Sequence, residues 1–228
     1  MFRKKINTIF KSLIKKNVNV VSTNIGQPVT ISWQGLERIT GIYKTPVPDG
    51  IYLSAEGVTG DAIGNPKVHG GALKAAYLFS EDHYPFWKTQ YPSLDWDFGM
   101  FGENLTISGL DETQLFIGSM YTLGEATVRI TTPREPCFKL GLRFKDQGII
   151  AAFVKHRRPG TYVQVLQPGL VREGDSMELV DLPEKKVSIA AFYTMWYAPE
   201  KDRKLILEVL NLPGISEQKQ KQLQKWIS

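Results

Sequence analysis

The only cysteine of the 228-residue chain lies in the stretch Thr132-Pro133-Arg134-Glu135-Pro136-Cys137-Phe138-Lys139-Leu140. A lone cysteine cannot form a disulfide within its own chain, so any role of Cys137 must come from its thiol or thiolate. The prolines restrict the backbone around Glu135. Arg134 and Lys139 bring positive charge that favours a thiolate able to act as a nucleophile or a metal ligand. A buried cysteine that packs as a small apolar side chain is equally compatible with these residues.

The composition is that of a globular protein in a reducing compartment. The apolar fraction is 42%, and eleven Phe, nine Tyr and five Trp supply material for a core. The single cysteine argues against a disulfide-stabilised secreted domain. No apolar run approaches the roughly 18 residues that a membrane-spanning helix needs. We therefore expect a soluble, cytoplasmic protein.

The net charge of +5 comes from the start of the chain. Residues 1–17 contain six Lys and Arg residues and no acidic residue, so the remainder is close to neutral. Bulk charge thus gives no support for a nucleic-acid partner. Apolar residues at helical spacing predict a basic amphipathic helix over residues 1–17. Such a helix can lie on an anionic membrane surface as a weak peripheral contact, or pack on its own domain or on a second copy in a homodimer.

Residues 18–182 have the pattern of a β-rich domain. Short runs rich in β-branched and aromatic residues are separated by Gly, Pro and Asp, which predicts strands at 18–22, 30–33, 41–43, 51–53, 75–79, 126–131, 162–166 and 177–180. Helices are predicted from an N-cap at Ser80 toward Trp87 and over residues 147–155. Many short strands with few helices indicate a mainly β fold of the α+β class, either a barrel or a strongly bent sheet.

Residues 183–228 form a third unit with a different pattern. Three helices are expected at about 188–197, 200–210 and 216–227, separated by turns that contain proline. A compact three-helix unit suggests a helix-turn-helix. However, this one lacks a basic recognition helix, so we do not expect it to bind DNA.

Two further segments carry candidate binding residues. In Val68-His69-Gly70-Gly71-Ala72-Leu73-Lys74 the adjacent glycines let backbone N–H groups approach an anion, and Lys74 adds charge. A tight turn before a strand explains these residues equally well. In Phe98-Gly99-Met100-Phe101-Gly102-Glu103-Asn104-Leu105 the loop presents either an acceptor and an amide to a ligand, or side chains that satisfy their own backbone. The three histidines lack the spacing of a zinc site.

The order of these segments is more specific than any one of them, and it resembles the MOSC domain, named for the C-terminal domain of molybdenum-cofactor sulfurase. The matching segments are Val68-His69-Gly70-Gly71 with Lys74-Ala75-Ala76-Tyr77, Phe101-Gly102-Glu103-Asn104-Leu105, the stretch from Pro133 to Leu140, Gly160-Thr161-Tyr162, and Val171-Arg172-Glu173-Gly174-Asp175. The chain looks like a stand-alone bacterial member with a C-terminal three-helix extension, and the resemblance covers residues 18–228. One departure is Gly118-Ser119, where many relatives have Gly-Asp.

The resemblance implies a bent MOSC-type β-barrel with a pocket centred on the cysteine. It implies that Cys137 is the catalytic residue and the metal ligand, binding molybdenum whose remaining ligands come from a pterin dithiolene. A soft thiolate near cationic groups agrees with that role. By the same mapping, the cofactor phosphate is bound by Arg134, Lys139, Lys74 and the Gly70-Gly71 turn. His69, Glu103 and Asn104 are then expected to line the pocket.

Three functions follow as hypotheses. The first is a molybdenum-cofactor-dependent reductase of small N-hydroxylated compounds such as hydroxylamino-purines, which needs an external electron donor protein because no flavin, iron–sulfur or nicotinamide motif is present. The second is a carrier that holds a persulfide on Cys137, or the intact cofactor, without turnover of its own. The third is an interaction module whose three helices or basic arm dock a partner.

Overall fold

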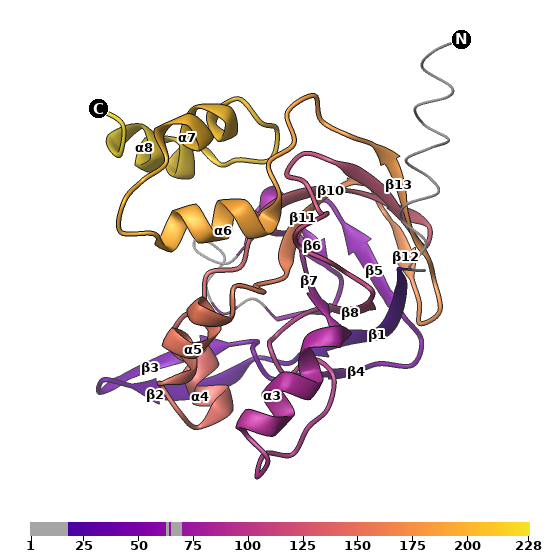
Figure 1. Ribbon diagram of the computed structural model, residues 1–228. Helices are drawn as coiled ribbons and strands as arrows, with labels where there is room; N and C mark the ends of the chain where they lie inside the picture. Colours follow the sequence, from indigo (N-terminus) through magenta and orange to yellow (C-terminus); the bar gives the residue numbers. More distant parts are fainter. Residues whose placement is uncertain (1–17, 63, 65–69) are drawn as a thin grey trace.

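The structure is a computed structural model that describes residues 18–62, 64 and 70–228 (Figure 1). The predicted helix over residues 1–17 and the candidate residue His69 lie outside the described residues. Within the described part, no helix is long and apolar enough to cross a membrane.

A strongly curved eight-stranded sheet dominates the fold. Its strand order is β13-β9-β10-β11-β7-β8-β1-β4, and every pair is antiparallel except β7 with β8. The sheet consists of β1 (Asn19–Gly26), β4 (Lys44–Pro46), β7 (Ala76–Ser80), β8 (Leu105–Ser108), β9 (Met120–Leu123), β10 (Ala126–Pro133), β11 (Thr161–Gln167) and β13 (Met177–Asp181). Hydrogen bonds such as Val20 N to Asp175 O, at 2.8 Å, join the start of β1 to the residues before β13. The curvature therefore brings two distant parts of the sheet together.

Alternation of burial explains why these residues form strands. In β10 the side chains of Ala126, Val128 and Ile130 are buried, while those between them are partly exposed. Successive strand residues point to opposite faces, so this pattern places one apolar face toward a core. A three-stranded sheet with the order β12 (Gly169–Val171), β5 (Ile51–Ser54) and β6 (Gly57–Val58), and a separate hairpin of β2 (Val29–Trp33) and β3 (Leu36–Thr40), complete the β structure.

The strand predicted at residues 41–43 is not formed, and the chain bends there between β3 and β4. The amide of Ile42 is hydrogen-bonded to the Thr40 hydroxyl at 3.2 Å, and Lys44 N donates to Ile42 O at 2.9 Å. The backbone at Gly41 also lies directly against Ala62, because a Cβ added at Gly41 would be 1.8 Å from the Ala62 carbonyl oxygen. Local turn hydrogen bonds thus replace a strand ladder at this point.

Short helices cover one side of the sheet. The 3₁₀ turn η2 (Glu81–His83) begins at Ser80, whose hydroxyl accepts from Asp82 N at 3.3 Å, and continues into α3 (Tyr84–Gln90). This confirms the predicted helix start. The helix predicted over residues 147–155 is α5 (Ile149–His156), whereas α4 (Phe138–Phe144) and the turn η1 (Ala72–Lys74) were not predicted.

Three C-terminal helices lie together, and α6 contacts β10 (Figure 1). They are α6 (Ile189–Tyr197), α7 (Arg203–Leu210) and α8 (Glu217–Lys225), close to the predicted positions. Each begins at a polar N-cap whose side chain accepts from a backbone N–H three residues on: Ser188, Asp202 and Ser216. Apolar residues of these helices belong to the same buried cluster as the sheet core. The division at residues 182 and 183 stays a prediction.

A second buried cluster is mainly aromatic and lies beneath the short helices. Trp87 is fully buried in α3 and packs against Phe101, Phe153 and Phe144, with ring centroids 5.9, 5.9 and 6.5 Å away. Offset and edge-to-face arrangements of this kind add to the free energy gained by burial. The overall result is a mainly β fold with a few helices, as the sequence predicts.

We expect Trp87→Ala to lower the free energy of unfolding by about 3–5 kcal/mol, because it leaves a cavity at the centre of this cluster. Urea denaturation measures the change. Lys88→Ala, at an exposed position of the same helix, is the matched control and should stay within about 0.5 kcal/mol of wild type. A loss no larger than that of the control would contradict this packing.

His156 at the end of α5 gives the fold a pH dependence. Its pKa is lowered to about 4 by burial and by the nearby His83, with Glu112 acting in the opposite direction. The unfolded chain, with an ordinary pKa near 6.5, therefore binds the proton first. Stability contributed by neutral His156 should be lost as the pH falls from about 6.5 through about 4.

His156→Phe tests this assignment, since a phenylalanine can keep the stacking on Phe86, whose ring centroid is 4.2 Å away. Urea midpoints measured between about pH 7 and about pH 4 should fall less steeply in the variant than in wild type. Equal slopes would show that other groups set the acid sensitivity.

Candidate functional site

The single cysteine sits where the sheet gives way to helix. β10 ends at Pro133, α4 begins at Phe138, and Cys137 is the extended N-cap residue between them, with φ −134° and ψ 173°. The side chain of Cys137 is partly exposed. A junction between a strand and a helix thus presents the sulfur at the surface of a cleft.

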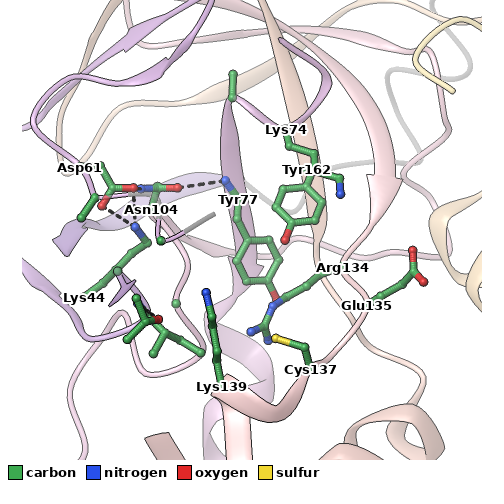
Figure 2. Close-up of a pocket in the computed structure, with 17 residues that line it drawn as sticks. Lys44, Asp61, Lys74, Tyr77, Asn104, Arg134, Glu135, Cys137, Lys139 and Tyr162 are labelled. Carbon is green, nitrogen blue, oxygen red and sulfur yellow. Dashed lines mark hydrogen bonds and ion pairs between the residues drawn. The ribbon is translucent and has the colours of Figure 1, made fainter. Parts of the chain in front are cut away.

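That cleft is the candidate site (Figure 2). It encloses about 680 Å³, counted with the part open to solvent. Its walls come from the bend after β3, the loop around residue 61, strands β7 and β11, and the junction from β10 to α4. The polar lining includes Lys44, Asp61, Lys74, Tyr77, Asn104, Arg134, Glu135, Cys137, Lys139 and Tyr162.

A buried guanidinium forms the floor of the cleft. Arg134 is 6% exposed, and its central carbon lies 5.2 Å from the ring centroid of Tyr77 and 5.7 Å from that of Phe153. Its Nη1 atom is buried and has no hydrogen-bond partner among the described residues. Figure 2 shows the guanidinium beside the sulfur of Cys137. A buried donor without a partner in a cleft is suited to an anionic or carbonyl oxygen of a ligand.

Two tyrosines close to Arg134 keep their protons. Burial raises the pKa of Tyr77 well above its ordinary value, and burial raises the pKa of Tyr162 as well. The hydroxyl of Tyr77 donates to the Pro159 carbonyl oxygen at 2.7 Å. The rings lie 5.4 Å apart and form an uncharged wall.

Two lysines face the same cleft from opposite sides. Burial lowers the pKa of Lys74, and the charge of Lys219 lowers it further, while Glu135 raises it. Burial also lowers the pKa of Lys139, opposed by Cys137 and reinforced by Arg38. Arg134 and Lys139 place positive charge near the sulfur, as the sequence indicates, and Lys74 adds a third cation to the lining of the cleft.

A buried ion pair forms the remaining wall. Lys44 Nζ contacts both carboxylate oxygens of Asp61, and both side chains are 7% exposed. Asp61 also accepts from Gly26 N at 2.8 Å and from Asn104 Nδ2 at 2.9 Å, and Asn104 Oδ1 accepts from Tyr77 N at 3.2 Å. Burial lowers the pKa of Lys44, with Asp61 acting against it. The network connects four separate segments: β4, the loop around residue 61, the residue before β8, and β7, as the dashed lines in Figure 2 show.

The structure separates the two adjacent candidates Glu103 and Asn104. Asn104 lines the cleft, whereas Glu103 is fully buried and is not part of the lining. The Glu103 carboxylate contacts the Tyr84 hydroxyl and accepts from Gly99 N, Phe101 N and Thr106 Oγ1, each at 3.0 Å. Burial raises the pKa of Glu103, and these donors oppose the rise. Glu103 therefore organises its own loop from inside.

The glycine turn is separate from the described lining of the cleft. Gly71 is the N-cap of η1, with φ 97°, and a Cβ added there would meet nothing within 4 Å. Gly70 and Gly71 are absent from the lining residues, although Lys74 at the end of the same turn is present. Ligand contacts of Gly70, Gly71 and His69 stay predictions.

Five of the ten polar lining residues named above were not predicted from the sequence: Lys44, Asp61, Tyr77, Glu135 and Tyr162. Tyr77 and Tyr162 lie in strands that were predicted, and alternation along each strand could have placed them on one face. Lys44 and Asp61 lie next to turns 17 residues apart, and no pattern in the sequence connects them. Within the described residues, no group of three or more His, Cys, Asp or Glu side chains could hold a metal ion. A metal at Cys137 would therefore need further ligands from a bound group.

A curved, mostly antiparallel sheet with one cysteine among cations at a cleft defines a β-rich protein with a cationic cleft. The family model for the MOSC domain matches residues 65–178. YflK of Bacillus subtilis is 33% identical over 203 residues, which cover 89% of this chain and 91% of YflK. The chain belongs to the MOSC family.

Two further relatives extend the comparison. A protein of Gibberella moniliformis named "Reductase" is 32% identical over 182 residues, which cover 78% of this chain but only 32% of that protein. The crystal structure of YiiM from Geobacillus stearothermophilus matches with a TM-score of 0.78 and 27% identity, covering 92% of this chain and all of that one.

We expect Lys44→Met to lower the free energy of unfolding by about 3–5 kcal/mol, because it leaves the Asp61 carboxylate buried without its cation. Arg172→Met is the matched control: it breaks the exposed pair of Arg172 with Glu125, and should cost at most about 1 kcal/mol. Both values come from urea denaturation. Similar losses in the two variants would show that the Lys44 pair is not a buried constraint.

Proposed function

We propose that this MOSC protein binds a molybdenum cofactor of the molybdopterin type and reduces small N-hydroxylated compounds, with Cys137 as the protein's ligand to molybdenum. The observation that carries the proposal is the placement of Cys137 beside the buried Arg134, whose Nη1 has no partner among the described residues. Membership of the MOSC family and the reductase name of the Gibberella relative support it.

The residues of the cleft fit such a cofactor. A cysteine thiolate is a soft ligand of the kind that transition metals accept. A cofactor phosphate needs cationic donors, and Arg134, Lys74 and Lys139 face the same cleft. Arg134 has the planar donor geometry that suits phosphate oxygens, and its unpartnered Nη1 is a donor that a bound anion would satisfy.

The reaction consumes two electrons and two protons: R–NHOH + 2e⁻ + 2H⁺ gives R–NH₂ + H₂O. When bound, the cofactor would supply the electron pair that breaks the N–O bond. An external electron donor protein would then reduce the cofactor again. The chain itself would bind, orient and protonate the substrate. Lys74 Nζ and Lys139 Nζ have lowered pKa values, which brings them closer to neutral pH as proton donors. The faces of Tyr77 and Tyr162 give a planar substrate an uncharged wall to pack against.

Metal and pterin analysis tests the proposal. Protein from a host grown with molybdate should contain both, and Cys137→Ser should lower bound molybdenum at least about 10-fold, since a ligand is lost. Protein from a host grown without molybdate is the control for specific loading. Lys88→Ala, at an exposed position away from the cleft, should load like wild type.

Mass spectrometry of the intact protein separates the proposal from a persulfide carrier. A sulfur carrier would show the mass of one added sulfur on Cys137, removable by reductant, and no metal. Wild-type protein without molybdenum or pterin from a molybdate-fed host would refute the proposed reductase.

A further inference from the structure

The segment that carries Cys137 is held by side chains from the C-terminal helices. Residues 134–136 lie between the end of β10 and the start of α4, outside any strand or helix. Two side chains anchor this segment on opposite sides. Arg134 points inward onto the rings of Tyr77 and Phe153, and Figure 2 shows Glu135 pointing away from the sulfur. The C-terminal helices contact this segment at Glu135.

Both oxygens of the Glu135 carboxylate are bound by the helical unit. Lys219 of α8 forms an ion pair with Oε1, and the indole Nε1 of Trp196 in α6 donates to Oε2 at 3.0 Å. Lys219 Nζ also lies 3.8 Å from the ring centroid of Trp196. The carboxylate, the ammonium and the indole thus form a closed triad in which each member contacts the other two.

The triad is shielded more than an ordinary surface pair. The Lys219 side chain is 13% exposed, compared with 72% for Lys221 on the same helix. Low exposure strengthens both the ion pair and the cation–π contact. Trp196 is itself supported by Trp226, 4.6 Å away, so the triad is continuous with the packing among the helices.

The triad also acts on the cleft through charge. Glu135 and Lys74 both line it, and the pKa of Lys74, lowered mainly by burial, is further lowered by Lys219 and raised by Glu135. Lys219 of α8 and Glu135 therefore act on Lys74 with opposite sign, so the C-terminal helices contribute to the electrostatics of the cleft.

We propose that Lys219 and Trp196 are positioning residues for Cys137: they bind the Glu135 carboxylate and thereby fix the segment that directs the sulfur into the cleft. The purpose of this positioning rests on the proposed function, in which the sulfur must meet a bound metal. Without the triad, Arg134 alone would anchor the segment, and Cys137 would sample orientations outside the cleft.

Alkylation of Cys137 by iodoacetamide measures the positioning directly, because the chain has no other cysteine. The reagent is uncharged, and each alkylation rate is divided by the thiolate fraction measured for the same variant at the same neutral pH. Protein from a host that cannot make the cofactor is used, so the result does not depend on molybdenum binding. A failure of the proposed function and a failure of this inference are then distinguishable.

We expect Lys219→Met to raise this corrected alkylation rate about fivefold, because the segment opens locally. Lys219→Arg keeps the charge and the contact with the Trp196 ring, and should return the rate to within about twofold of wild type. Lys221→Met, on the same helix, should react like wild type. Trp196→Phe, which loses the indole donor but keeps a ring, should be intermediate.

A double-mutant cycle shows whether Lys219 acts through Glu135. Glu135→Gln should raise the rate as Lys219→Met does, and the double variant should react no faster than either single variant. Glu135 is 43% exposed, so Glu135→Gln carries the test if Lys219→Met fails to fold. A wild-type rate in Glu135→Gln, independent effects that multiply in the double variant, or an equal effect of Lys221→Met would overturn the inference.

Discussion

The burial of the Arg134 guanidinium is the constraint on which the cleft depends. A buried cation is costly unless its charge and its donors are compensated. Arg134 lies on the faces of Tyr77 and Phe153, and no carboxylate in the described part of the chain forms an ion pair with it. Rings from β7 and α5 therefore pack against Arg134, which follows β10. Its buried Nη1 donor has no partner among the described residues and is left for a ligand.

The carboxylates near the cleft are all engaged elsewhere, which preserves its positive charge. Asp61 is bound to Lys44 and Asn104. Glu103 faces inward and is surrounded by donors of its own loop, of α3 and of β8, and Glu135 turns outward to Lys219. None of the three forms an ion pair with Arg134. This arrangement favours an anionic group over a cation in the cleft, as a phosphate-bearing cofactor requires.

Local pattern and chain order predict a large part of this structure. Strand alternation, the cap at Ser80 and the three C-terminal helices follow from short-range chemistry, and Cys137 with Arg134 and Lys139 can be selected from one stretch. The pair of Lys44 with Asp61 cannot be predicted from a local stretch, because it forms only when the bend after β3 lies against a separate loop. Helix α4 was missed for a related reason: the prolines before it and Gly141 within it weaken its local signal. The inward rotation of Glu103 likewise depends on donors from α3 and β8.

The C-terminal helices take part in the architecture of the site as well as in the core. Their apolar residues belong to the cluster beneath the sheet, including Ile189, Phe192 and Leu223, which fixes α6 and α8 in place. A fixed pair of helices can then hold Glu135 at a defined position, and Glu135 lies between Arg134 and the Pro136-Cys137 step. The packing of these helices, although it lies away from the cleft, thereby restricts the position of the Cys137 sulfur. A metal ligand benefits from such restriction, because the geometry of a metal site is set by how firmly its ligands are held.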